Sequence, residues 1–346
     1  MRERFLRACR RQPVDCTPVW FMRQAGRSLP EYRSLRERYA LLDIVRLPEL
    51  CVEVSLQPVR RLGVDAAIVF ADITIPFEGL GVDFEIRPGV GPVVAHPLRT
   101  PGDVARLRRY AAGDLAGALV EALRLLRRES PVPVIGFAGA PFTLASYLIE
   151  GAPTRRFREV KRFLHEQPEA WDDLMHRLTD AAIDYLSAQA TAGAEALQVF
   201  DSWVGCLAPE VYRRAVQPHM RRLFAALPEV PIIHFGTDTG GLLSDLAAAG
   251  GDVIGLDWRI DLGRGWEVVG EKAVQGNLDP VMAAEPWPVA RAGAEQVLAE
   301  AAGRPGHVFN LGHGVLPDTP VDNLRRLVDF VHETSVRGDG AREAVG

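Results

Sequence analysis

The sequence predicts an α/β protein: a single (β/α)8 barrel over residues 1–346, with the active-site cleft at the carboxyl ends of its strands. Two observations support this fold class. Eight short apolar runs occur along the chain, and most of them precede a stretch with apolar residues at helical spacing. The runs are continuous rather than alternating, which is typical of parallel strands buried on both faces. No linker-like segment separates the units, so we expect one domain.

Each run is a candidate strand because it is short and rich in β-branched or aromatic residues. In chain order the runs are PVWFM from position 18, AAIVF from 66, VPVIGF from 132, ALQVF from 196, VPIIHF from 230, DVIGLD from 252, AVQGNL from 273 and HVFNL from 307. The competing architecture, an open doubly wound sheet, would place a GxGxxG turn after the first strand. The segment RQAGR stands there instead, so the barrel is preferred.

Helix signals lie between the candidate strands. Proline is favoured in the first turn of a helix, and Pro48 and Pro209 each precede a glutamate. Residues 121–129 (EALRLLRRE) and 322–331 (DNLRRLVDFV) carry apolar residues at helical spacing. The unit between the second and third strands is longer than the others. Within it, residues 82–95 (VDFEIRPGVGPVVA) predict a β-hairpin that turns at Pro88 to Gly91.

Residues 131–149 contain no charge and are long enough to span a bilayer. Three prolines and two glycines interrupt them, and Glu150 follows directly. We therefore interpret the segment as a strand, a Gly/Pro turn and the start of a helix, and we expect no membrane span. At the carboxyl end of the sequence, residues from about 337 to 346 (RGDGAREAVG) are polar and rich in glycine, which predicts a disordered tail.

Composition narrows the class of protein. The formal net charge is −5 with both signs interspersed, which argues against a nucleic-acid partner or an anionic membrane surface. The four cysteines form neither a CxxC pair nor a regular framework, which indicates reduced thiols. The N-terminal stretch MRERFLRACRRQP has too short an apolar core for a secretory signal. We expect a soluble, cytoplasmic protein.

Polar side chains follow several candidate strands, at the positions that form the active site of a (β/α)8 barrel. They are Arg23 and Arg27, Asp72, Asp201 and Ser202, Asp257, and His313, with Tyr147 one or two turns into the helix after the third strand. Each has a structural alternative. The aspartates could cap helices, and Tyr147 could be a core residue. His313 is harder to explain by packing, because glycines flank it on both sides.

The residue types at this mouth indicate an anionic substrate. Only two of the 40 basic residues are lysine, so arginine supplies nearly all of the positive charge. The guanidinium group binds carboxylates bidentately and stays charged. Arg23, Arg27 and His313, with Asp72 as the one obvious carboxylate on the first two strands, therefore predict a pocket for a polyanion.

The chain resembles the uroporphyrinogen decarboxylase family. PVWFMRQAGRSLPEY and GFAGAPFTLASYLIEG are similar to the two signature segments of that family, and IVFADI, FDSWVG and NLGHGVLP match its other site segments in the same order. The similarity runs from about Phe5 to Val336. It implies a single (β/α)8 barrel that is usually a homodimer. It also implies conversion of the four acetate side chains of uroporphyrinogen III to methyl groups, giving coproporphyrinogen III and CO2 without a metal or organic cofactor.

The resemblance also implies roles for individual residues. The substrate-binding loop would comprise Arg23, Gln24, Ala25, Gly26 and Arg27, and Tyr147, Ser202 and His313 fall on substrate-contacting positions. Asp72 would face the pyrrole N–H groups and stabilise the positive charge that develops on the ring. Arg23 is the favoured candidate for assisting proton delivery, although arginine rarely releases its proton. Two departures from the family, Ala71 and Phe142, lie outside this chemistry.

Four alternatives compete with this interpretation. A zinc- and cobalamin-linked methyltransferase of the same superfamily would need a His-x-Cys pair, but Gly236 follows His234 at the cysteine position. A Schiff-base aldolase would need a lysine at a strand end, which neither Lys161 nor Lys272 provides. A phosphate-binding barrel could use the NLGHG loop but leaves the arginines unexplained. An inactive porphyrin-binding relative would be expected to have lost Asp72 or the arginine pair.

Overall fold

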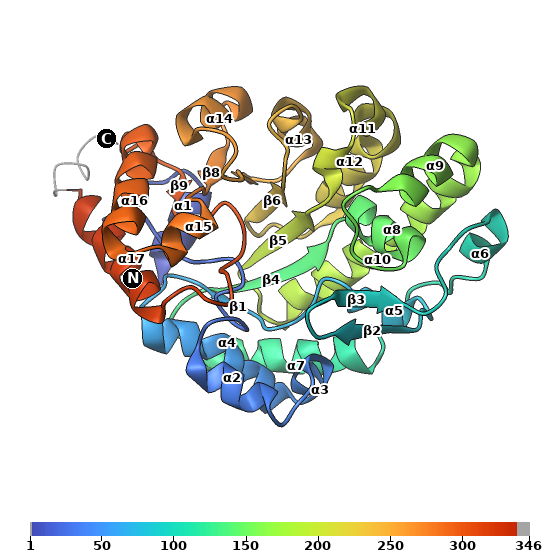
Figure 1. Cartoon of the computed structure of the whole chain (residues 1–346), viewed down its shortest axis with the longest axis horizontal. Helices are drawn as coiled ribbons and strands as arrows, with labels where there is room; N and C mark the ends of the chain where they lie inside the picture. The colour runs from blue at the N-terminus through green and yellow to red at the C-terminus, as the bar shows by residue number, and fades with distance from the viewer. Residues whose placement is uncertain (1, 338–346) are drawn as a thin grey trace.

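Seven parallel strands form one curled sheet, in which the strand order follows the chain. The computed structural model describes residues 2–337. Helices alternate with the strands and cover the outside of the sheet (Figure 1). Each strand pairs with the next strand of the sheet in parallel register, for example Leu197 with Ile232. The strands are β1 (Ala67–Ile68), β4 (Val134–Gly139), β5 (Ala196–Asp201), β6 (Ile232–Gly236), β7 (Val253–Gly255), β8 (Ala273–Gln275) and β9 (His307–Val308).

The helix signals identified in the sequence all fall on helices of the structure. Pro48 and Pro209 start helices, and the two amphipathic segments lie within α7 and α17. The helices are α1 (Glu3–Cys9), α2 (Pro30–Arg36), α3 (Leu41–Arg46), α4 (Pro48–Leu62), α5 (Pro76–Gly79), α6 (Pro101–Ala105), α7 (Asp114–Glu129), α8 (Pro141–Glu150), α9 (Arg158–Glu166), α10 (Pro168–Ala192), α11 (Pro209–Ala215), α12 (Gln217–Ala226), α13 (Leu243–Ala249), α14 (Leu262–Val269), α15 (Pro280–Ala284), α16 (Trp287–Ala301) and α17 (Val321–Thr334), with a short 3-10 turn, η1 (Val204–Cys206).

Two further predictions are confirmed. The hairpin consists of β2 (Phe84–Arg87) and β3 (Gly91–Val94), which pair in antiparallel register outside the main sheet. The uncharged segment 131–149 contains β4 and most of α8, joined at Ala140. Every residue of β4 is buried. Helices cover the outer face of the curled sheet, and the inner face of β4 points toward the strands on the opposite side of the curl. This accounts for its continuous apolar character.

The prediction of a full strand at residues 18–22 is wrong. Only Val19 pairs, in a parallel bridge with Phe309, and its carbonyl accepts the N–H of Asp65 at 2.7 Å. Beyond it, side chains take the backbone donors that a strand would offer to its neighbour. The N–H of Phe21 donates to Gln24 Oε1 at 2.9 Å, and the N–H of Met22 donates to an asparagine side chain, Asn310. The apolar run is therefore buried without forming a ladder.

The interior of the sheet contains a buried polar chain as well as apolar side chains. Trp20 Nε1 donates to Gln275 Oε1 at 2.9 Å, and Gln275 Nε2 donates to Gln198 Oε1 at 3.2 Å. All three side chains are almost fully buried. Buried amides need such partners, since an unpaired polar group would cost about 1–3 kcal/mol. The chain links residue 20 to β8 and β5 across the interior.

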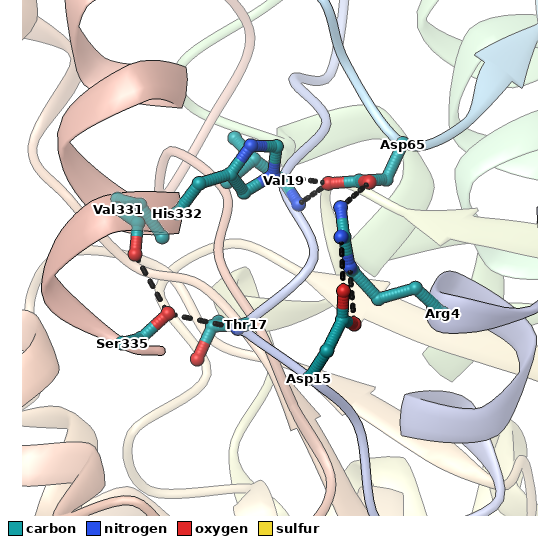
Figure 2. Close-up of polar contacts among 8 residues, drawn as sticks. All are labelled: Arg4, Asp15, Thr17, Val19, Asp65, Val331, His332 and Ser335. Carbon is teal, nitrogen blue, oxygen red and sulfur yellow. Dashed lines mark hydrogen bonds and ion pairs between the residues drawn. The ribbon is translucent and has the colours of Figure 1, made fainter. Parts of the chain in front are cut away.

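A buried ion-pair network joins the amino-terminal segment, the start of β1 and the last helix (Figure 2). Arg4 Nη1 lies 2.7 Å from Asp65 Oδ1, and the same guanidinium binds Asp15. The second oxygen of Asp65 accepts the N–H of Val19 at 2.8 Å and lies 2.7 Å from Nε2 of His332. Segments far apart in the sequence are thereby fixed beside the first residues of the sheet.

Several expectations concern the chain as a whole. None of the helices in residues 2–337 combines the length and the apolar character that crossing a bilayer requires. Within the same residues the four cysteines are free thiols rather than disulfides. Of the predicted disordered tail, residues 338–346 lie outside the described residues.

Candidate active site

The RQAGR segment is a tight turn whose shape depends on Gln24 and Gly26. Gln24 is buried, and its amide is used within the protein: Oε1 accepts the N–H of Phe21, and Nε2 donates to the carbonyl of Ala66 at 2.9 Å. Gly26 has φ +91°, and a Cβ there would lie 2.6 Å from the Phe70 ring. The positive φ and the close approach both require glycine. Gln24 and Gly26 therefore shape the loop, and the neighbouring Ala25 is buried.

Arg23 leaves this turn toward the loop that follows β9. Its φ is +60°, which turns the chain out of the extended conformation. The aliphatic part of its side chain lies against Gly314, where a Cβ would come within 2.4 Å of Arg23 Cδ. A hydrogen bond of 2.9 Å from the N–H of Val315 to the carbonyl of Met22 joins the two loops. Arg23 is exposed, so its guanidinium is available to a ligand.

The charge on Arg23 acts on the pKa of three other side chains of the predicted site. Burial lowers the pKa of Arg27, and the charge on Arg23 lowers it further. Burial raises the pKa of the Tyr147 hydroxyl, and the charge on Asp72 acts in the same direction while Arg23 opposes it. Burial lowers the pKa of His313 to about 4, and Arg23 is the next largest cause. The structure thus brings these five side chains into one region.

His313 is uncharged at neutral pH in the free protein. Its ring lies edge-to-face against Trp258 at a centroid distance of 6.2 Å, and close to Phe235 at 6.4 Å. Burial in this aromatic setting and the adjacent arginines disfavour the imidazolium. The positive charge around His313 in the free protein therefore comes from arginine, and His313 presents a neutral ring.

The Asp72 carboxylate has one engaged oxygen and one free oxygen. Oδ1 accepts the N–H of Thr74 at 2.9 Å and its hydroxyl at 2.6 Å, which fixes the turn between β1 and α5. Oδ2 accepts no hydrogen bond from any of the described residues. The structural alternative, in which the aspartate only stabilises a turn, therefore accounts for Oδ1 but not for Oδ2. The partly exposed carboxylate keeps the other available for a ligand.

Tyr147 and Ser202 come from the next two strand–helix units. Tyr147 lies in α8 and stacks on Trp203 with the ring centroids 4.0 Å apart. Trp203 follows Ser202 directly, and its N–H donates to Thr143 Oγ1 at 3.3 Å. The main-chain carbonyl of Ser202 is fixed by the hydroxyl of Thr237, while its own side chain remains partly exposed. The aromatic pair therefore couples α8 to the loop after β5.

Two carboxylates singled out in the sequence have structural roles instead. Asp201 is fully buried, and its Oδ1 accepts the hydroxyl of Thr143 in α8 at 3.1 Å. Asp257 is also buried, and it accepts the N–H of Asp238 and a bond of 2.7 Å from Arg259 Nη1. Both side chains hold loops at the carboxyl ends of the strands. Neither is open to a ligand, because each is almost completely enclosed by protein atoms.

Arg259 is a site residue that the sequence analysis missed. Its guanidinium lies 4.0 Å from the centre of the Trp258 ring, and the other neighbour of that ring is His313. Arg259 also contributes to the lowered pKa of His313. Its position two residues beyond Asp257, at the end of a strand, was the available signal. It adds a third arginine to the mouth formed by Arg23 and Arg27.

The His234 position does not resemble a metal site. His234 is fully buried and packs against Phe224 of α12, with the ring centroids 4.9 Å apart. A Cβ at Gly236 would meet Thr239 and Val204, so no ligand-sized space adjoins it. The nearest carboxylate oxygen, on Asp201, is 3.9 Å from His234 Nε2. This histidine belongs to the packing between the sheet and its helices.

Arginines, an aspartate and a tyrosine lie beyond the carboxyl ends of the strands of a curled parallel sheet, which is where α/β enzymes of barrel-like architecture have their active sites. The uroporphyrinogen decarboxylase (URO-D) family model matches residues 1–334. The chain belongs to the uroporphyrinogen decarboxylase family. Relatives named uroporphyrinogen decarboxylase include those of Chloroflexus aurantiacus, 54% identical over 96% of both chains, and Sorangium cellulosum, 51% identical over 99% of this chain and 100% of the relative.

Solved structures extend the likeness at lower identity. A methyltransferase from Methanosarcina mazei superposes with a TM-score of 0.82 over 96% of this chain and 98% of that chain, at 22% identity. A putative vitamin-B12 independent methionine synthase from Listeria monocytogenes gives a TM-score of 0.61 over 93% and 98%, at 12% identity. At these identities the likeness concerns the fold alone.

Proposed function

We propose that the protein removes CO2 from the four acetate side chains of uroporphyrinogen III and yields coproporphyrinogen III, a step of tetrapyrrole and haem biosynthesis. Membership of the family supports the reaction class. The observation that supports the proposal is that the charges of Arg23 and Asp72 both act on Arg27, so these three side chains lie near one another. A substrate with eight carboxylates and four pyrrole N–H groups needs both cations and a hydrogen-bond acceptor.

Each decarboxylation exchanges a carboxylate for a hydrogen. The bond between the methylene carbon and the carboxylate breaks, CO2 leaves, and the methylene carbon takes up a proton to become a methyl group. The electron pair of the broken bond has to enter the pyrrole ring. The ring accepts it after protonation at a ring carbon, as a cationic imine, and later releases that ring proton. One proton is consumed for every CO2 formed.

Asp72 would stabilise this cation. A fixed carboxylate within hydrogen-bond reach of the pyrrole N–H groups lowers the energy of the positive ring as the charge develops. The contacts that support the role are those of Oδ1 with Thr74, because they orient the group and leave Oδ2 unused. A preoriented acceptor does not need to reorganise during the reaction, which is the source of its advantage over water.

The arginines and neutral side chains would bind the periphery of the substrate. Arg23 and Arg27 would hold carboxylates, with the loop residues Gln24, Ala25 and Gly26 setting their positions. Tyr147 and Ser202 would contact the remaining polar groups as neutral donors, and His313 would contact a carboxylate. Arg23 would also assist proton delivery, since it is exposed at the centre of the site.

A finer description of the fold belongs to the same proposal. We infer that residues 18–20 complete an eighth position between β9 and β1, closing a (β/α)8 barrel in a single domain. Support comes from the bridge between Val19 and Phe309, and from backbone bonds on both sides of Val19. The family resemblance further suggests a cytoplasmic homodimer. Analytical ultracentrifugation at several concentrations tests the dimer.

One assay tests the function. Purified protein, treated with a chelator, is mixed with uroporphyrinogen under reducing conditions, and the products are separated by chromatography. We expect the stepwise loss of four CO2 groups without added metal or organic cofactor. Turnover that disappears with EDTA and returns with zinc would instead favour the alternative, a zinc/cobalamin-linked methyltransferase. The residues around His234 do not support that alternative, because Gly236 stands at the position where the methyltransferase would need a cysteine ligand.

A further inference from the structure

A group of possible metal ligands lies on the outer helix layer, apart from the candidate active site. Asp172 and His176 stand four residues apart on α10, which places them on one face of that helix. His219 comes from α12, the helix that packs beside α10. One ligand atom from each of the three side chains lies within 4.8 Å of the other two. The sequence could not reveal the group, because His219 is distant from the other two along the chain.

Two of the three separations between these side chains suit a small divalent ion. His219 Nε2 lies 3.3 Å from Asp172 Oδ1, and His176 Nδ1 lies 3.2 Å from the other oxygen, Asp172 Oδ2. His176 Nδ1 also lies 2.9 Å from the main-chain carbonyl of Asp172, so the exposed ring of His176 would turn away from this carbonyl to bind an ion. Two ligands bonded to zinc at about 2.0–2.1 Å and at a tetrahedral angle stand roughly 3.3–3.4 Å apart. The two imidazole rings are nearly perpendicular, with centroids 4.8 Å apart, so both nitrogens can approach one point without the rings colliding.

Burial divides the three residues into a fixed ligand and two adjustable ones. The side chain of His219 is only 7% exposed, so packing between the helices fixes its position. The side chains of Asp172 and His176 are 61% and 51% exposed, so they can adjust and an ion can enter from solvent. Arg222 of α12, whose charge acts on His219, is paired with Asp180 and so is not left as an uncompensated positive charge.

We propose that Asp172, His176 and His219 form a binding site for a divalent transition-metal ion, with zinc as the natural occupant and water as the fourth ligand. Two imidazoles and a carboxylate favour zinc, nickel or copper over magnesium or calcium, which prefer oxygen ligands. The ion would join α10 to α12, which follow neighbouring strands of the sheet. Its role would be to stabilise the fold, because an ion that binds only the native protein shifts the unfolding equilibrium.

The test measures zinc binding and thermal unfolding of the full chain. Calorimetry of the chelator-treated protein should show one zinc ion per chain. At a free zinc concentration about a hundredfold above the dissociation constant, the melting temperature should rise by about 3–4 °C. His176→Ala removes an exposed ligand without a cavity, and His219→Gln removes the buried one. Both variants should lose the zinc-dependent rise, and His165→Ala, an exposed histidine on α9, should keep it.

Three results would overturn the proposal. The first is that the parent protein binds no zinc, which would mean that the three side chains form only a histidine–aspartate ion pair. His176→Ala would show the full rise if the ion binds elsewhere. With cobalt as the probe, a thiolate-to-metal absorption band would place the ion on a cysteine. A cobalt spectrum without that band, together with loss of binding in both ligand variants, would support the assignment.

Discussion

The side chain of Arg23 lies against Gly314, so that the first loop of the site and the loop after the last strand share one surface. A Cβ at position 314 would stand 2.4 Å from Arg23 Cδ. Gly314 does not have a left-handed backbone conformation, so alanine is compatible with its main chain. The reason for glycine at this position is therefore the room that it leaves for Arg23.

Gly314→Ala should consequently displace the Arg23 side chain while the fold persists. We expect weaker substrate binding and lower turnover, because the guanidinium would no longer reach its carboxylate. Kinetics and thermal unfolding measure the two effects separately. Gly117→Ala is the matched control: it lies in α7 with open space around it, and should leave turnover unchanged and stability equal or higher. Parental kinetics in Gly314→Ala would argue against the proposed position of Arg23 in the complex.

Arg27→Gln should weaken binding more than it weakens the fold. Losing one charge-assisted contact to a carboxylate should cost about 1.5–3 kcal/mol, which corresponds to roughly a ten- to hundredfold increase in the dissociation constant. Arg128→Gln removes the same charge from the exposed face of α7 and serves as the control. Met22→Ala, in the core, should instead lower stability by roughly 2–5 kcal/mol. Equal affinity in Arg27→Gln and the parent would contradict the anion site.

His313 should take up a proton when the substrate binds. In the free protein, burial and the charges of Arg23, Arg259 and Arg27 lower its pKa to about 4, below the ordinary value near 6.5. A substrate carboxylate beside the ring favours the charged form, so the pKa rises in the complex. At pH 6 the free protein carries a neutral ring, and binding is accompanied by proton uptake.

Calorimetry at pH 6 in two buffers with different ionisation enthalpies counts the protons taken up. His313→Gln should lower that count, and the difference from the parent isolates His313 from the substrate's own carboxylates. The lowered pKa also has a consequence for stability. The unfolded chain binds more protons than the native protein between about pH 6.5 and 4, so this group reduces stability as the pH falls through that window. The same proton uptake in both proteins would show that His313 remains neutral.

Asp65→Asn should destabilise the fold without changing the site chemistry. Its carboxylate joins Arg4, the N–H of Val19 and His332 at the amino-terminal end of the sheet (Figure 2). Breaking a buried ion pair by changing one partner typically costs about 3–5 kcal/mol. Denaturant unfolding measures the loss, with the exposed Asp318→Asn as the control. An unfolding free energy equal to that of the parent would show that this network does not contribute to stability.

Continuous apolar runs in the sequence predicted most of the strands. The prediction was wrong where side chains accept the backbone N–H groups that a strand would donate to its neighbour. The run at 18–22 has the composition of a strand, but Gln24 and Asn310 accept the N–H groups that a ladder would use. Gln24 is only three residues from Phe21, but no local pattern reveals Asn310 as the partner of Met22. The helix starts at Pro48 and Pro209 were predictable, because proline acts through its own geometry.

The site shows the same division. Arginine and histidine at strand ends could be identified from residue type and position alone. The sequence could not show whether a carboxylate at the end of a strand faces a ligand or the helix layer, since the direction of the side chain depends on the local twist. Asp201 is fully buried, with Oδ1 bonded to Thr143 and Oδ2 unpaired among the described residues, whereas Asp72 is partly exposed and can present its Oδ2 to a ligand. Arg259 escaped notice because its relation to His313 arises only when two distant loops meet.

The central claim is that the charge of Asp72 stabilises a cationic pyrrole, and Asp72→Asn tests it most directly. Asparagine keeps the size of the side chain and an oxygen that accepts both bonds from Thr74, so the turn should survive. Thr74→Val is the matched control, because it removes one of these bonds and leaves the carboxylate in place. Both variants should be purified as folded proteins before their kinetics are compared.

The measurement is kcat of Asp72→Asn for uroporphyrinogen, together with its melting temperature. We predict that kcat falls roughly a hundredfold or more, as expected when an electrostatic contribution of about 3–4 kcal/mol is lost, while the melting temperature stays near that of the parent. Thr74→Val should retain most of its turnover. A folded Asp72→Asn protein with the kcat of the parent would contradict the mechanism, because Asp72 would then only stabilise the turn before α5.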